Sequence, residues 1–131
     1  MITSIYPVLM STDVAASAAF FTERFSFETV FEADWYVSLR RDSWELAFVD
    51  ADHPTIPSGF RAAASGVLVN IEVDHVDEEY ARLTAAGDVR VALELRSEDF
   101  GQRHFIVVAP GGVLVDVIEP IPYAGEFAAQ I

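Results

Sequence analysis

One order of predicted elements occurs twice along the chain, and this repeat constrains the fold more than any other feature. In the first half, a strand pattern over residues 5–10 leads through Ser11-Thr12-Asp13 into a helical pattern over residues 14–25. Three alternating strand patterns follow, at residues 28–33, 36–40 and 44–49. A loop over residues 50–65, rich in turn-forming residues, then separates this copy from the next.

The second copy begins with a strand pattern over residues 67–73, and Asp74 is predicted to cap a helix over residues 76–86. Strand patterns follow at residues 89–95, 102–108 and 113–119. Asp13 and Asp74 therefore lie at equivalent corners, about sixty residues apart. A period this long that occurs only twice predicts two β-α-β-β-β units in a single domain. The predicted divisions are a first unit at residues 4–50, a second unit at residues 66–120 and a tail at residues 121–131 that packs on the surface or on a partner subunit.

A hairpin signal lies near the end of the second copy. Two short apolar runs flank Pro110-Gly111-Gly112, where proline presets φ and glycine permits a positive φ. In the second run, three valines at positions 113, 115 and 117 alternate with Leu114, Asp116 and Ile118. Because side chains alternate between the faces of a strand, Asp116 is predicted to lie opposite the valines. A carboxylate on an otherwise apolar strand requires a partner that satisfies its charge. The identity of this partner would distinguish an enzyme from a binding protein.

Composition restricts the function classes. Hydrophobic residues make up 52% of the 131 residues, which predicts a compact globular protein. The formal net charge of −13 argues against nucleic acid and anionic membranes as partners. The chain has no apolar run of about 18 residues and no signal-peptide pattern, so a cytoplasmic location is expected. The chain has no cysteine, so thiolate metal sites and cysteine nucleophiles are excluded.

The sequence resembles the vicinal oxygen chelate superfamily, which includes glyoxalase I, extradiol dioxygenases and bleomycin-resistance proteins. Gly101-Gln102-Arg103-His104-Phe105 resembles a Gly-Gln-Arg-x-Phe motif of the bleomycin-resistance-like branch, and the segment from Asp13 to Phe27 resembles the first helix and its exit. The turn Ala109-Pro110-Gly111-Gly112 departs from the usual Asp-Pro-Asp-Gly but keeps its proline and final glycine. The resemblance spans the chain from Tyr6 to Glu119.

The resemblance implies an α+β fold in which the two β-α-β-β-β units pair their sheets into a cup, and it implies a homodimer. In the metalloenzyme members, four positions hold a divalent cation, and here they correspond to Tyr6, Glu45, Leu68 and Asp116. Leucine cannot ligate a metal, so only Glu45 and Asp116 are good ligands. A catalytic metal site usually needs about three protein ligands and an open position. We therefore predict no metal and no other cofactor, with one divalent ion held by Glu45 and Asp116 as the alternative.

Strand parity agrees with this placement without use of the family. Residues 67, 69, 71 and 73 are all apolar, so Leu68, Asn70 and Glu72 share the other face of their strand. By the same reasoning, Glu45 lies opposite Leu46 and Phe48. These polar faces either line a cavity or meet water. The carboxylates could also be structural, bonded to each other or to Tyr6 or Arg103, or they could titrate as a coupled acid–base pair.

Aromatic residues at strand entrances and in loops suggest what is bound. These are Trp35, Tyr36, Phe60 and Phe100, and their alternative role is ordinary core or dimer packing. His53 and His75 are expected at the surface, and His104 is a possible ligand contact. The leading hypothesis is a metal-free binding protein that sequesters an aromatic or cationic metabolite or antibiotic. The predicted contacts are Tyr6, Trp35, Glu45, Phe60, Asn70, His104 and Asp116.

Two alternatives to the binding protein stay open. One is an enzyme, a divalent-metal-dependent lyase, isomerase or dioxygenase that uses Glu45 and Asp116. The other is a cup filled by its own side chains, in a protein that acts through its dimer surface. No phosphate-binding loop, nucleophile elbow or His-Glu metal helix favours any further class.

Overall fold

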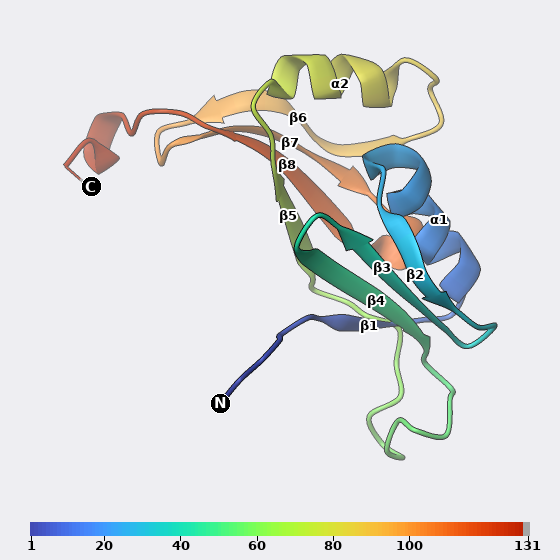
Figure 1. The fold of residues 1–131 in the computed structure, drawn as a ribbon. Helices are drawn as coiled ribbons and strands as arrows, with labels where there is room; N and C mark the ends of the chain where they lie inside the picture. Colours follow the sequence, from blue (N-terminus) through green and yellow to red (C-terminus); the bar gives the residue numbers. More distant parts are fainter. Residues whose placement is uncertain (130–131) are drawn as a thin grey trace. The chain divides into compact units, whose positions relative to one another are not determined.

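The structure, a computed structural model that describes residues 1–129, is an α+β protein with two four-stranded sheets (Figure 1). The chain divides into two compact units. The first unit comprises Met1–Ser65 with Pro110–Gly112, and the second comprises Gly66–Ala109 and the chain from Val113 on. No helix among the described residues is long and apolar enough to cross a membrane.

The first unit contains one helix and four strands in the predicted order. The elements are β1 Val8–Ser11, α1 Val14–Phe25, β2 Glu28–Glu32, β3 Tyr36–Arg41 and β4 Trp44–Asp50. The sheet order is β1-β4-β3-β2, with β1 parallel to β4 and the other pairs antiparallel. A parallel β1–β4 pair requires a crossover, which α1 and the β2–β3 hairpin supply.

The second unit repeats this topology. Its elements are β5 Leu68–Glu72, α2 Val76–Thr84, β6 Arg90–Glu98, β7 Gln102–Val108 and β8 Leu114–Pro120. The sheet order is β5-β8-β7-β6, and β5 is again the parallel strand. Two short 3₁₀ turns, η1 Pro110–Gly112 and η2 Gly125–Phe127, complete the described chain. The predicted repeat of two β-α-β-β-β units is confirmed.

The core of the first unit forms between α1 and one face of its sheet. The predicted apolar stripe of Val14, Ala18, Phe21 and Phe25 is buried. The ring centroids of Phe21 and of Phe48 on β4 are 5.6 Å apart. Full burial of a phenylalanine or leucine side chain contributes about 1.5–3 kcal/mol each. Because successive strand residues alternate, Glu45 and Ala47 lie on the face opposite α1. We call the sheet face opposite the helix of each unit its distal face.

The core of the second unit forms in the same way under α2. Phe105, Val107, Val115 and Val117 are fully buried, and the Tyr80 ring of α2 meets the Phe105 ring edge-on at 5.0 Å. Asp116 lies between two of these valines, so its side chain points to the distal face, as the alternation predicted.

The two helices begin in different ways. The Asp13 side chain caps α1 by accepting a hydrogen bond from the Ala16 N–H at 3.0 Å, as predicted. The prediction that Asp74 caps the second helix is wrong, because α2 is capped at His75 without a side-chain bond. The Val76 N–H instead donates to the Glu119 carboxylate of β8 at 3.1 Å. Glu119, which is distant in the sequence, thus accepts the hydrogen bond of the Val76 amide that the neighbouring Asp74 does not accept.

Element boundaries differ from the predictions at a few places. β1 begins three residues later than predicted, because Pro7 precedes it and cannot donate to a ladder. β6 continues three residues beyond Leu95, to Glu98, because its pairing with β7 extends to Gln102. Gly111 and Gly112 adopt φ values of 81° and 90°, as the hairpin prediction required. The last two residues of the predicted tail, 130 and 131, lie outside the described residues.

Candidate functional site

Three side chains on the distal face of the second unit form a hydrogen-bonded polar cluster, of which two are buried and Glu98 is partly exposed. His104 of β7 lies between Asp116 of β8 and Glu98 at the end of β6. The His104 Nδ1 is 2.7 Å from Asp116 Oδ1, and its Nε2 is 2.8 Å from Glu98 Oε2. His104 and Asp116 are only 5% and 6% exposed. We call Glu98, His104 and Asp116 the histidine cluster.

The charge state of the histidine cluster follows from its geometry. A neutral imidazole has one N–H, whereas both ring nitrogens here face a carboxylate oxygen, so the arrangement suits the doubly protonated imidazolium. Burial opposes the charge and lowers the pKa of His104, but the hydrogen bonds to Glu98 and Asp116 outweigh it, and the net pKa lies above its ordinary value. The same bond from His104, followed by that from Arg96, lowers the pKa of Glu98. The formal charges of Arg96, Glu98, His104 and Asp116 cancel.

The register of the second sheet decides which residue of β5 accompanies Asp116. Asn70 is the direct partner of Asp116 across the parallel β5–β8 pair, whereas Leu68 pairs with Leu114. Asn70 and Leu68 are both exposed on the distal face, in agreement with strand parity. The nearest polar neighbour of Asp116 on β5 is therefore Asn70.

The distal face of the first unit carries a second group of polar side chains. Glu45 of β4 is half-buried and accepts a hydrogen bond from the Ser4 hydroxyl at 3.2 Å. Burial first, and then electrostatic interactions with Tyr6 and Glu45, raise the pKa of Tyr36. By strand pairing Tyr36 shares this face with Glu45, and Tyr6 lies within electrostatic range of Tyr36. Tyr36 was recognised as an aromatic residue but was not among the predicted contacts, although strand parity with Val37 and Leu39 would have found it.

The predicted aromatic contacts are dispersed. Trp35 stacks on His53, with ring centroids 3.9 Å apart and an interplanar angle of 15°, and it meets Tyr36 at 5.5 Å. Phe60 is 72% exposed in the loop that follows β4. His75 is exposed as expected, whereas the expected surface residue His53 is half-buried because Trp35 covers one face of its ring. One face of Trp35 is therefore already occupied by the chain itself.

The structure brings some predicted site residues together and leaves others apart. It joins His104 to Asp116 directly and sets Asn70 beside Asp116, and it brings Tyr6 and Glu45 within electrostatic range of Tyr36. The structural alternative in which Arg103 binds Asp116 is wrong, since the Arg103 guanidinium binds the Asp77 carboxylate of α2 at 2.8 and 3.1 Å. Sequence reasoning missed Glu98, because the predicted strand ended at Leu95.

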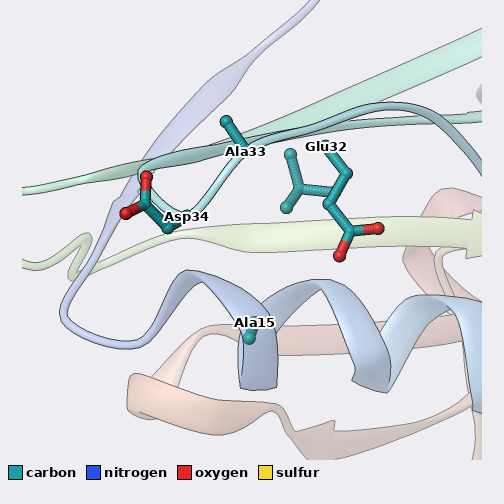
Figure 2. Close-up of a pocket in the computed structure, with 5 residues that line it drawn as sticks. Ala15, Glu32, Ala33 and Asp34 are labelled. Atoms are coloured by element: carbon teal, nitrogen blue, oxygen red, sulfur yellow. The ribbon is translucent and has the colours of Figure 1, made fainter.

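A shallow pocket of about 500 Å³ lies elsewhere in the first unit, beside α1 (Figure 2). Figure 2 shows the Glu32 carboxylate extending toward the helix that carries Ala15, and Ala33, Asp34 and Val37 complete the lining. None of the predicted contact residues lines this pocket.

The residues at the metal positions of the family are a poor fit for a divalent cation. Leu68 has no donor atom, and the Oδ1 atom of Asp116 already accepts a hydrogen bond from a buried imidazole. Asn70, which the register puts beside Asp116, offers only an amide oxygen. Among residues 1–129, no group of three histidine, aspartate or glutamate side chains is arranged to hold a metal ion.

Comparisons with known proteins agree with the fold. Residues 5–117 match the profile of the Glyoxalase/Bleomycin resistance protein/Dioxygenase superfamily, and no curated protein sequence matches the chain significantly. Lactoylglutathione lyase from Agrobacterium tumefaciens is a similar solved structure, with 22% identity, a TM-score of 0.73, and coverage of 89% of this chain and 92% of that chain.

Two further solved structures show the same likeness. TioX from Micromonospora sp. ML1 has 20% identity and a TM-score of 0.70, over 91% of this chain and 99% of that chain. A glyoxalase/bleomycin resistance protein/dioxygenase family enzyme from Burkholderia phytofirmans PsJN has 15% identity and a TM-score of 0.75, over 88% and 97% of the two chains. At these identities the likeness to the solved structures shows the fold alone. The family assignment rests instead on the profile match, which covers most of the chain. The chain therefore belongs to the Glyoxalase/Bleomycin resistance protein/Dioxygenase superfamily.

Proposed function

We propose that this protein is a metal-free small-molecule binding protein of the bleomycin-resistance type, which sequesters an aromatic or cationic metabolite or antibiotic. One observation carries the proposal: Asp116, which stands at a metal-ligand position of the family, is held by a buried imidazole instead of being free for a cation. A carboxylate fixed in this way is suited to accept hydrogen bonds from an organic ligand with its second oxygen. Asn70 beside it supplies a donor and an acceptor.

The preference for a cationic or aromatic ligand rests on the first unit. Glu45 shares the distal face with Tyr36, and Tyr6 lies within electrostatic range of Tyr36; a carboxylate on a face with phenol rings attracts organic cations through charge and cation–π contact. The net charge of −13 adds long-range attraction for such ligands. Trp35 and Phe60 are proposed to contribute stacking, and the Trp35 surface facing away from His53 is the part available for it.

The proposal includes a cytoplasmic homodimer. Several large apolar side chains on or beside the sheet of the first unit are exposed in a single chain, and a second copy would cover such surface. They are Ile5, Val8, Val30, Phe31 and Trp44. Sedimentation equilibrium of the full chain tests the homodimer separately from ligand binding.

Binding is tested with chelator-treated protein and two probes, metal-free bleomycin and the flat cation ethidium, by isothermal titration calorimetry. We expect stoichiometric binding of at least one probe, and a loss of about tenfold in affinity for Glu45→Gln, since a lost charged contact is worth about 1.4 kcal/mol or more. Glu23→Gln, an exposed acid on α1, is the matched control and should bind like the unmodified protein. Equal affinity in both variants would contradict the assignment of Glu45.

The competing class is a metal enzyme, and the same preparation tests it. One similar structure is a lactoylglutathione lyase, so that reaction is assayed after addition of Ni²⁺, Zn²⁺, Mn²⁺ or Fe²⁺. The binding-protein proposal predicts no turnover with any of these ions and no stoichiometric metal retained after dialysis. Retained metal together with turnover would overturn the binding-protein proposal and show that the protein is a metal-dependent enzyme.

A further inference from the structure

The described C-terminal segment is joined to the turn between β6 and β7 by backbone hydrogen bonds. The Ile121 N–H donates to the Gly101 carbonyl at 2.9 Å, and the Ala124 N–H donates to the Asp99 carbonyl at 2.8 Å. Figure 1 shows this red segment passing beside that turn after β8 ends. We call residues 121–127 the strap. Two backbone bonds to one turn fix the strap at a defined place on the second unit.

Side chains complete the contact, and two glycines make it possible. A Cβ atom added to Gly101 would overlap the Tyr123 ring and lie 3.1 Å from the Ile121 carbonyl oxygen, and its φ of +90° favours glycine. A Cβ atom on Gly125 would likewise lie 2.6 Å from the Asp99 carboxylate. The turn and the strap therefore pack closely because each of them has a glycine, which carries no side chain, at the contact.

A chain of rings leads from the strap to the histidine cluster. Phe127 meets Phe100 edge-on at 6.1 Å, and Phe100 meets the His104 ring edge-on at 6.3 Å. His104 is 5% exposed, although it lies on the distal face and next to a turn. The two phenylalanines stand on the side of His104 where the strand pairing of β6 and β7 ends.

We propose that the strap seals the histidine cluster: by holding Phe127 against Phe100, it keeps water away from His104 and so fixes the Asp116 carboxylate in one orientation. The strap and Phe100 are positioning elements, because they act on Asp116 only through His104. Hydrogen bonds between charged groups strengthen when water is excluded, so the seal would hold the cluster rigid. This role is independent of the ligand that the protein binds.

The seal is tested by the exchange of the His104 ring N–H protons with water, measured by ¹⁵N-resolved NMR on the full chain. In the unmodified protein both ring N–H signals should be visible, because burial slows their exchange. Phe127→Ala should accelerate this exchange by about tenfold or more, since a local opening becomes easier when its apolar contact is lost. Phe127→Leu keeps an apolar side chain and should restore most of the protection.

Two controls separate a local seal from general destabilisation. Ile2→Ala removes an exposed apolar side chain from the first unit and should leave the His104 signals unchanged. Backbone amide exchange in β7 and β8 should stay the same in Phe127→Ala, while that of residues 99–101 rises. Ring N–H signals absent in the unmodified protein, or equally protected in Phe127→Ala, would overturn the proposal. Uniformly faster exchange along β7 and β8 would also overturn it, because the strap would then be part of the sheet's stability.

Discussion

The two units share one topology but place their distal-face carboxylates in different surroundings. Glu45 on β4 is half-buried and bonded to a serine hydroxyl, whereas Asp116 on β8 is buried and bonded to an imidazole that a second carboxylate also holds. The cross-strand neighbours of the two acids differ at two positions: the residue directly opposite is Arg40 for Glu45 and Ile106 for Asp116, and the diagonal residue is Ser38 or His104. Ser38 pairs with Ala47 in the first unit, and His104 pairs with Ile118 in the second. Only Asp116 therefore has an imidazole within hydrogen-bonding reach, and it belongs to the ionic cluster centred on His104.

The largest expected effect comes from removal of the imidazole. His104→Ala should lower the free energy of unfolding by about 3–5 kcal/mol, because it leaves a buried carboxylate without its partner. Ser38→Ala at the corresponding place in the first unit should cost less than about 1 kcal/mol. Urea denaturation of both variants measures the contrast. Similar losses would mean that the two distal faces do not differ as described.

A smaller difference in the free energy of unfolding is expected between substitutions of the two carboxylates themselves. Asp116→Asn should cost about 1.5–3 kcal/mol, because it replaces a hydrogen bond to a charged group in a buried site. Glu45→Gln should change the free energy of unfolding by no more than about 0.5 kcal/mol, since its site is partly in water. The same urea titrations provide the values. A larger loss for Glu45→Gln than for Asp116→Asn would reverse the comparison.

The histidine cluster should also make stability depend on pH. The folded-state pKa of His104 is raised, so between the ordinary histidine pKa of about 6.5 and the raised value the folded protein binds more protons than the unfolded chain. The stabilisation is complete below the ordinary pKa and is lost as pH rises through the raised one, with a slope of at most about 1.4 kcal/mol per pH unit for one proton.

Urea midpoints measured across this pH range check the expected slope. The difference between the unmodified protein and His104→Gln isolates the contribution of His104 from that of His53 and His75. A pH-independent difference would contradict the charged state of the cluster.

The two helix N-termini give the smallest contrast. Asp13→Ala removes the cap of α1 and should cost about 1 kcal/mol. Asp74→Ala should be nearly neutral, because Glu119 and not Asp74 receives the first amide of α2. Thermal unfolding followed by circular dichroism compares the two variants. Equal losses would show that Asp74 contributes in solution after all.

Sequence patterns predicted the elements well and their ends less well. Alternation on β8 correctly set Asp116 opposite the valines, and helical spacing identified the buried stripe of α1. The cap at Asp74 was wrong because the competing acceptor, Glu119, lies 43 positions away from Val76. Glu98 was missed because the end of β6 is set by pairing with β7, which no local pattern reports.

The sequence by itself determined the repeat, the faces of the strands and the family, because each of these depends on periodicity or on residues close together in the chain. Only the tertiary structure decided what surrounds each acid. Strand register set Asn70 and not Leu68 beside Asp116, and it brought His104 between two carboxylates. Register is a property of paired strands, and a shift of one residue moves every side chain to the other face. The chemistry of a site built across three strands is therefore decided by their pairing.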